Sequence, residues 1–337
     1  MRSDYLSGDT LQSIYFGGGT PSLLTEKELS AIFNQIYKTF SIEEDAEVTL
    51  EANPDDLTPE KVQILKNSPV NRLSIGIQSF FEEDLKAWNR AHTAAEAIAC
   101  IQRVQDAGFE NLTADLIYGA TTTPDEHWVE NIQRLIDFKI PHLSCYALTV
   151  EERTALGHFV RKGRVEAPKD EHAARQFEIL MKMMAEHGYD HYEISNFAKS
   201  GYYAVHNSSY WKGSHYLGIG PGAHSFNGDS RSWNIANNPK YIKAIRQGKQ
   251  SGIQLYETEY LTLEQKYNEY ILTGLRTIWG CSLEHIRSIK PEFEAHFIQK
   301  VQPFVEKNWM QEQAKTFTLT QKGKLLADYI SAELFLL

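Results

Sequence analysis

The chain has 337 residues, of which 42% are hydrophobic and 23% charged, and its formal net charge is -10. This length and composition predict a globular protein with one large domain and a smaller one. The negative charge argues against a nucleic-acid partner, because proteins that bind a phosphate backbone usually carry a basic surface. The sequence has no apolar run of about eighteen residues and no apolar leader at its start, so we expect a cytoplasmic protein.

The three cysteines, Cys100, Cys145 and Cys281, lie far apart in the sequence. Separations of 45 and 136 residues fit neither a metal-binding knuckle nor a disulfide framework. We therefore expect three buried thiols with a structural role.

The first predicted element is a short buried strand over residues 13–16, which leads into three glycines, Gly17 to Gly19. Backbone without side chains can lie flat against a ligand, although a glycine triplet alone is more often an ordinary tight turn. Thr25 and Glu28 then have the spacing of a capping box and predict a helix start. The chain thus opens with a strand, a bare loop and a helix.

The same pattern recurs along the first half of the chain. Five strands that alternate with amphipathic helices predict a parallel α/β sheet that curls into a full or partial barrel. Further strands are expected at residues 47–50, 72–77, 111–118 and 142–148, and helix starts at Thr58 with Pro59, Thr93 with Glu96, and Thr123 with Glu126.

Ligands of such folds gather at the carboxyl ends of the strands. In this sequence those ends carry glycine amides, carboxylates and carboxamides, which suit a ligand with an amino group, a carboxylate and hydroxyls. Each residue alone has an ordinary structural explanation, so the prediction depends on their convergence at one rim. The rim residues are Gly17 to Thr20, Glu51, Asn53, Gln78, Asp115 or the pair Tyr118 and Gly119, and Thr149 with Glu151.

A second unusual region follows a predicted strand segment at residues 189–198. Residues 206–211 (HNSSYW) and 216–225 (YLGIGPGAHS) are rich in aromatic residues, histidine and glycine, and poor in charge. A neutral imidazole beside Tyr and Trp in a glycine-rich loop could ligate haem iron or stack on a flat macrocycle. The ordinary alternative is a packed structural histidine.

The composition divides the chain into three expected parts. Residues 1–200 form the βα barrel, and 201–256 form a connecting region with the histidine and glycine motifs. Residues 257–337 form a small, mainly helical domain of winged-helix type, with a strand at 317–319 and a closing helix over 320–337.

Eight motifs, in order along the chain, resemble those of the radical S-adenosylmethionine (SAM) proteins related to oxygen-independent coproporphyrinogen III oxidase. The resemblance covers essentially the whole chain. In addition, HNSSYW resembles the HNxxYW signature of the HemW haem chaperones of this group, which the true oxidases lack. The eight motifs are GGGTPS (17–22), EANP (51–54), GIQSF (76–80), NRAHT (89–93), ADLIYG (114–119), YALTVE (146–151), YEISNFA (192–198) and GIGPGAHS (218–225).

This resemblance implies roles for particular residues. The backbone of the glycine loop would bind the methionyl amino group of SAM, and four polar residues would bind its ribose and carboxylate ends. Arg90 would supply a bidentate carboxylate clamp. His206 would be the haem iron ligand, with three motif residues beside it. The implied SAM residues are Gly18, Gly19, Thr20, Glu51, Gln78, Arg90 and Asp115, and the implied haem residues are His206, Asn207, Tyr210 and Trp211.

The sequence departs from this family at its N-terminus. Family members begin with a strand and a CxxxCxxC loop whose thiolates hold a [4Fe-4S] cluster, and this sequence starts after that segment. The three cysteines cannot replace the loop, because their spacing is wrong and Cys100 falls in a predicted helix. We expect a mis-called start or a truncated chain rather than a paralogue without redox chemistry, because the SAM residues are intact.

The leading hypothesis is a cytoplasmic haem chaperone of HemW type that binds haem and SAM, and a [4Fe-4S] cluster when full length. It would pass haem to a respiratory haem protein at the membrane, and a homodimer is one option for its assembly. The alternative is an oxygen-independent coproporphyrinogen III oxidase, a radical enzyme of porphyrin biosynthesis. Whether the chain is an enzyme, and with which catalytic residues, stays open. A barrel that binds a phosphorylated small molecule is disfavoured, because no Lys or Arg adjoins the glycine loop.

Overall fold

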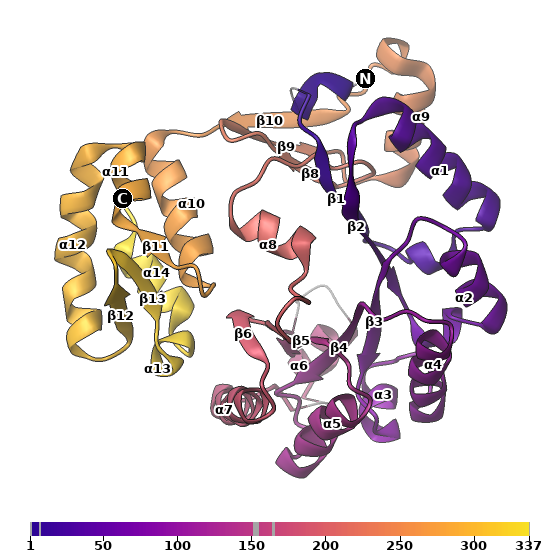
Figure 1. Ribbon diagram of the computed structural model, residues 1–337, viewed down its shortest axis with the longest axis horizontal. Helices are drawn as coiled ribbons and strands as arrows, with labels where there is room; N and C mark the ends of the chain where they lie inside the picture. The colour runs from indigo at the N-terminus through magenta and orange to yellow at the C-terminus, as the bar shows by residue number, and fades with distance from the viewer. Residues whose placement is uncertain (1, 7, 151–154, 164–165, 337) are drawn as a thin grey trace. The chain divides into compact units, whose positions relative to one another are not determined.

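The computed structural model describes residues 2–6, 8–150, 155–163 and 166–336, which form two compact units. The first unit is Leu11–His206, and the second combines Met1–Thr10 with Asn207–Leu337. Figure 1 shows the elements of both units, coloured along the chain. Glu151, which we predicted at the rim, lies outside the described residues.

A seven-stranded sheet forms the first unit, in the order β1-β2-β3-β4-β5-β7-β6. Strands β1 to β5 are parallel and the sheet is curled (Figure 1), which confirms the predicted partial barrel. A hairpin completes the sheet, because β7 pairs antiparallel with β5 and with β6. The strands are β1 (Leu11–Phe16), β2 (Ile42–Ala52), β3 (Arg72–Gln78), β4 (Leu112–Tyr118), β5 (His142–Ala147), β6 (Asp190–Glu193) and β7 (Asn196–Ala198).

Helices cover one face of this sheet, with α1, α2, α4 and α5 along its outer side in Figure 1. Apolar residues of the strands pack against these helices and form the core, as Leu50, Leu73 and Leu116 show by their complete burial. The helices are α1 (Glu26–Thr39), α2 (Pro59–Lys66), α3 (Glu82–Ala87), α4 (Ala94–Asp106), α5 (Asp125–Asp137), α6 (Ala155–Arg161) and α7 (Asp170–Glu186).

The opposite face of the five parallel strands is polar. Successive side chains of a strand point to opposite faces, and the strand register aligns Ser13 with Glu47, Glu51 with Ser74, and Asp115 with Ser144. The inner face of the curl therefore carries a continuous polar layer. Its members are Ser13, Tyr15, Glu47, Thr49, Glu51, Arg72, Ser74, Thr113, Asp115, His142, Ser144 and Tyr146.

Two of the predicted capping boxes are confirmed. Thr25 accepts a hydrogen bond from the backbone of Glu28, and the Glu28 side chain accepts one in return at the start of α1. Thr93 and Glu96 do the same at the start of α4. Thr58 also caps α2 as predicted.

The predicted capping box at Thr123 and Glu126 is wrong. Helix α5 starts after Pro124, whose side chain offers no capping bond. Thr123 is completely buried and donates instead to Asp84, with 2.7 Å between Oγ1 and Oδ1. An unpaired buried carboxylate is more costly than an uncapped helix end, so Asp84 recruits the hydroxyl.

The second unit contains a three-stranded antiparallel sheet in the order β10-β9-β8. Residues 206–211, which we predicted to lie in a glycine-rich loop, form most of helix α8 (Val205–Trp211). The other elements of this part are β8 (His224–Phe226), β9 (Ser230–Asn234), α9 (Asn238–Gln247) and β10 (Tyr256–Tyr260).

Five helices and a three-stranded antiparallel sheet form the described C-terminal part of this unit, which is mainly helical as predicted. The predicted closing helix is broken into α13 (Gln321–Lys324) and α14 (Ala327–Leu334), and the break follows Gly323, a poor helix former. The remaining elements are α10 (Leu263–Leu275), β11 (Cys281–Ser282), α11 (Leu283–Ile289), α12 (Pro291–Glu306), β12 (Met310–Gln313) and β13 (Thr316–Leu319).

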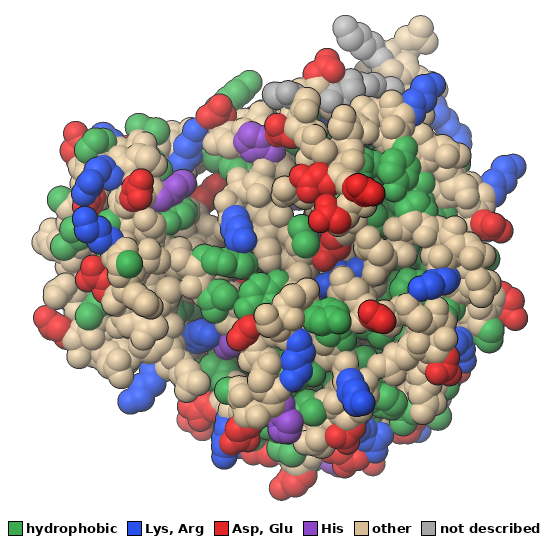
Figure 2. Space-filling view, in the orientation of Figure 1, with side chains coloured by type: hydrophobic (Ala, Val, Ile, Leu, Met, Phe, Trp, Pro, Cys, Tyr) green, Lys and Arg blue, Asp and Glu red, His purple; other side chains and the backbone are tan. Residues whose placement is uncertain are grey.

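Charge is mixed on the surface that Figure 2 presents, where Lys and Arg side chains are interspersed with Asp and Glu. Within the part of the chain that the structure describes, no helix has both the length and the apolar character needed to cross a bilayer.

Candidate functional site

The glycine loop follows β1 directly and has a backbone that few other residues would adopt. Gly18 and Gly19 have positive φ angles of 73° and 76°. A Cβ atom added at either position would meet no atom within 4 Å, so the side of the loop is open. Thr20 comes next, half-buried, and its side chain makes no capping bond to the short helix that follows. The loop therefore presents bare backbone.

Glu51, near the end of β2, joins this loop to β1. One carboxylate oxygen accepts a hydrogen bond from Tyr15 Oη at 2.6 Å, and the other accepts one from the backbone N–H of Gly18 at 3.2 Å. Burial raises the pKa of Tyr15, and the adjacent Glu51 carboxylate raises it further. The phenol thus stays protonated and keeps donating to Glu51.

Arg90 and Gln78 converge beside the end of β3. Arg90 donates from Nη2 to Asn53 Oδ1 at 3.0 Å, and its Nε is buried without a hydrogen-bond partner. A Cβ added to Gly76 would stand 2.8 Å from Gln78 Nε2 and 3.3 Å from Arg90 Nη2, so the two side chains lie over the same glycine. A buried guanidinium N–H without a partner suits a ligand carboxylate.

Asp115 lies on the inner face of β4, between β3 and β5. Burial raises the pKa of its carboxyl from 3.8 to about 7, hydrogen bonding to Ser144 opposes the shift, and the Glu51 charge adds to it. Ser74 also donates to Asp115 at 3.4 Å. A carboxyl that is partly protonated near neutral pH can both donate to and accept from hydroxyl groups.

Other predicted rim residues serve the fold. Tyr118 is buried and its ring packs 5.4 Å from that of Trp128. The Gly119 N–H donates to Gln176 Oε1 at 2.7 Å, also inside the core. Thr149 is exposed, and its hydroxyl contacts the backbone of its own segment.

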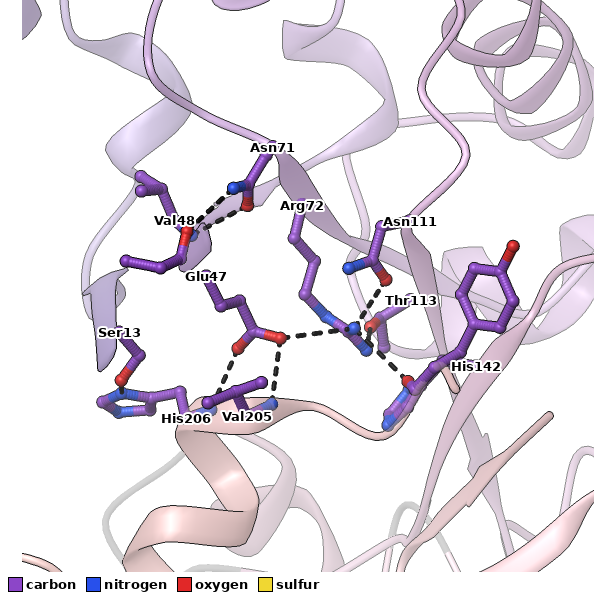
Figure 3. A network of polar contacts seen from close by, with 12 residues as sticks. Ser13, Glu47, Val48, Asn71, Arg72, Asn111, Thr113, His142, Val205 and His206 are labelled. Carbon is purple, nitrogen blue, oxygen red and sulfur yellow. Dashed lines mark hydrogen bonds and ion pairs between the residues drawn. The ribbon is translucent and has the colours of Figure 1, made fainter. Parts of the chain in front are cut away.

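His206 is held against the sheet at the start of α8 (Figure 3). Its Nδ1 lies 3.0 Å from Ser13 Oγ, and its ring stacks on that of Tyr15 at 4.6 Å between centroids. The backbone N–H groups of Val205 and His206 donate to the Glu47 carboxylate at 2.9 and 3.0 Å. Burial lowers the pKa of His206, so its imidazole is neutral at physiological pH.

The Glu47 carboxylate that holds α8 is itself paired with Arg72, at 3.5 Å between Oε2 and Nη1. Both side chains are almost fully buried, with exposed fractions of 4% and 1%. Arg72 also donates to Asn111 at 2.6 Å and to Thr113 at 2.8 Å (Figure 3).

Three residues of this network, Tyr15, Glu47 and Arg72, were not among those predicted from the sequence. A pattern in the sequence points to them, because ionisable and polar residues occupy alternate positions of strands that are otherwise apolar. Such alternation within a parallel sheet, whose strands are usually apolar on both faces, indicates a ligand-facing side.

The rest of the HNSSYW motif continues along α8. Asn207 and Trp211 are half-buried and Tyr210 is exposed. Tyr210 packs edge-on against Trp211 at 5.7 Å and against Tyr216 at 5.4 Å. The motif therefore presents an aromatic cluster in the second unit.

The cysteines are separate and buried, as predicted. Cys100 lies in α4, Cys145 in β5 and Cys281 in β11. Burial raises the pKa of the Cys100 thiol to about 12, which disfavours the thiolate that a metal requires. Among the described residues, no three His, Cys, Asp or Glu side chains are grouped as for a metal ion, so these residues do not fit a [4Fe-4S] cluster.

A curled parallel sheet with a glycine loop after β1 and polar strand ends agrees with the comparison with protein families. Residues 4–135 match the Radical SAM superfamily. The solved structure of coproporphyrinogen III oxidase (HemN) from Escherichia coli superposes with a TM-score of 0.81 and 20% identity, over 99% of this chain and 80% of that one. The chain thus has the fold of a radical SAM protein.

Curated relatives narrow this class. The heme chaperone HemW of Bacillus subtilis is 34% identical to this chain, over 95% of this chain and 84% of the relative. The heme chaperone HemW of Lactococcus lactis is 32% identical, over 94% of this chain and 82% of the relative. A mitochondrial radical S-adenosyl methionine domain-containing protein of Mus musculus is 31% identical, over 96% of this chain and 72% of the relative. The chain belongs to the HemW family.

Proposed function

We propose that the protein is a cytoplasmic haem chaperone that binds haem and SAM and delivers haem to a respiratory haem protein. The observation that carries this proposal is the placement of His206. Ser13 contacts Nδ1, while Nε2 has no hydrogen-bond partner among the described residues and is not one of their buried, unpartnered polar atoms. One imidazole nitrogen is therefore open to a ligand, and the low pKa keeps it unprotonated.

Haem would bind through this Nε2 atom of His206. A neutral imidazole whose other nitrogen is hydrogen-bonded is the usual form of a histidine ligand, because that bond fixes the ring orientation. Asn207, Tyr210 and Trp211 follow on the same helix, and the aromatic rings offer flat surfaces for a macrocycle.

SAM would bind at the rim of the first unit. The open backbone at Gly18, Gly19 and Thr20 and the Glu51 carboxylate suit its amino group and hydroxyls, and the orphan N–H of Arg90 suits its carboxylate. Gln78 and Asp115 supply further donors and acceptors. The thiolate ligands of a [4Fe-4S] cluster would have to be other than the three buried cysteines.

The second candidate function is oxygen-independent coproporphyrinogen III oxidation. The chain shares its fold with the oxidase of Escherichia coli, with a TM-score of 0.81. Formation of protoporphyrinogen from coproporphyrinogen III by the purified protein would decide for this function.

The proposal is tested by titrating the protein with ferric haem and following the Soret absorbance. His206→Ala should weaken haem binding by at least about ten-fold, because the iron loses its protein ligand, which corresponds to about 1.4 kcal/mol. The matched control is His187→Ala, a half-buried histidine whose Nδ1 contacts the Met183 carbonyl of its own helix. Equal affinities of the wild type and His206→Ala would contradict the assignment of His206, and absence of haem binding by the wild type would contradict the proposed function.

A further inference from the structure

His206 is oriented by the sheet rather than by the helix on which it lies. Its ring nitrogen contacts Ser13 of β1, and the backbone at the start of α8 donates to Glu47 of β2. Figure 3 shows these contacts on one side of the histidine. The position of the imidazole therefore follows the positions of two strands that also lead to the glycine loop and to Glu51.

Tyr15 is the residue through which these strands connect the two candidate sites. Its ring stacks on His206 with an interplanar angle of 21°, and its hydroxyl donates to Glu51 at 2.6 Å. Ser13 and Tyr15 are two residues apart on β1 and so share the inner face. One side chain thus contacts the candidate haem ligand with its ring and a candidate SAM ligand with its hydroxyl.

The space around Tyr15 restricts its ring to this orientation. A Cβ atom at Gly17 would lie 2.5 Å from Tyr15 Cε1 and 2.9 Å from Glu51 Oε1, so the glycine leaves room for both groups. The His206 ring packs against the aromatic ring at 4.6 Å. Tyr15 therefore cannot shift without disturbing Glu51, His206 or both.

A ligand that fixes Glu51 would also fix the acceptor of the Tyr15 hydroxyl. With the phenol held, the ring against which His206 stacks is held as well, and less conformational freedom remains to be lost when haem binds. Ligands that order the same side chain bind with positive cooperativity, and the coupling acts equally in both directions.

We propose that Tyr15 is a positioning residue shared by the two sites, and that SAM bound at the rim strengthens haem binding at His206. This inference rests on the proposed function, because it requires both ligands. The hydroxyl of Tyr15 transmits the coupling between SAM binding and haem binding.

The experiment measures the haem dissociation constant by Soret titration, without SAM and with SAM at ten times its own dissociation constant, which calorimetry provides. In the wild type, SAM should lower the haem dissociation constant by about five-fold or more, within the usual range of coupling. Calorimetry should show that haem lowers the SAM dissociation constant by the same factor as SAM lowers the haem dissociation constant.

Tyr15→Phe is the decisive variant, because it keeps the ring and removes the hydroxyl. It should still bind haem alone, because the ring that stacks on His206 remains, while the ratio of the haem dissociation constants without and with SAM falls to about one. Tyr15→Ala also removes the stacked ring, so haem binding itself should weaken. Tyr37→Phe on α1, whose side chain is exposed, is the matched control and should keep the wild-type coupling.

The outcomes separate the two proposals. Haem binding that depends on His206 but is equally strong with and without SAM would overturn the coupling and leave the proposed function standing. A Tyr15→Phe variant with the wild-type coupling factor would overturn the role of its hydroxyl. Failure of the wild type to bind haem or SAM would overturn both, and circular dichroism of each variant establishes that the compared proteins are folded.

Discussion

Glu47 and Arg72 form a buried ion pair that determines the position of His206, the candidate haem ligand. Glu47 receives two backbone N–H groups of α8 and one guanidinium, so its carboxylate is well satisfied although it is buried. Removal of one partner from such a pair leaves the other charge buried and uncompensated. The position of His206 thus depends on a charge pair in the interior of the sheet.

Glu47→Ala should lower the free energy of unfolding by about 3–5 kcal/mol, because Arg72 loses its counter-charge in a buried position. Urea unfolding followed by circular dichroism measures this loss. Glu47→Gln, which keeps an acceptor for the α8 backbone, should lose less. Glu44→Ala, at an exposed position of the same strand, is the control, and an equal loss in Glu44→Ala and Glu47→Ala would contradict the prediction.

Asp115 should make the stability of the protein depend on pH. Its folded-state pKa of about 7 lies above the ordinary value of 3.8, so the folded protein binds the proton more tightly than the unfolded chain. The contribution of this group is therefore greatest below pH 3.8 and is lost as the pH rises through 7.

Asp115→Asn isolates this effect, because the amide does not titrate. As the pH rises from 3.8 to about 7, the free energy of unfolding of Asp115→Asn should increase relative to that of the wild type. Above this range, the difference between the two free energies should be constant. Urea unfolding of both proteins across the window checks this. A difference that does not change with pH would show that the carboxyl keeps its ordinary pKa.

Among the helices, two predicted capping boxes with the same sequence spacing have different outcomes in the structure. Thr93 with Glu96 and Thr123 with Glu126 have the same spacing in the sequence, but only the first pair forms a capping box. The second hydroxyl is taken by Asp84, which is distant in sequence. Spacing alone could not reveal this competition, because it depends on burial in the folded protein.

Glu96→Ala should therefore lower the free energy of unfolding, because the backbone N–H of Thr93 loses its acceptor, while Glu126→Ala should leave it unchanged within error. Both glutamates lie in the first turn of a helix and are exposed, so each variant controls for the other. Thermal or urea unfolding provides the values. A loss in Glu126→Ala similar to that in Glu96→Ala would mean that the α5 start is capped after all.

Helix α8 was beyond sequence-based prediction for a similar reason. A helix of seven residues is not stable alone, and this one begins where Glu47, far away in the chain, accepts its first N–H groups. The five parallel strands and their helices were predictable, because each carries its own period of apolar residues and its own stop signals.

For the whole molecule, several residues of the candidate SAM site could be predicted from the sequence. The contacts that connect this site to His206 could not be predicted. Parallel topology sends all strand ends to one rim, which identified Glu51, Gln78 and Asp115 before any coordinates. Arg90 lies in a loop and came only from family resemblance. Tyr15 lies within a strand, where an aromatic residue is ordinary, and its double contact depends on the register of β1 with β2.

Strand β1 carries contacts to both candidate sites, which affects how these sites respond to local motion. Ser13 contacts His206 and Tyr15 contacts Glu51, and both residues belong to this one strand. A local displacement of β1 against β2 would therefore loosen both contacts together, while the core and its covering helices stay folded. The two candidate sites would then open and close as one unit rather than separately.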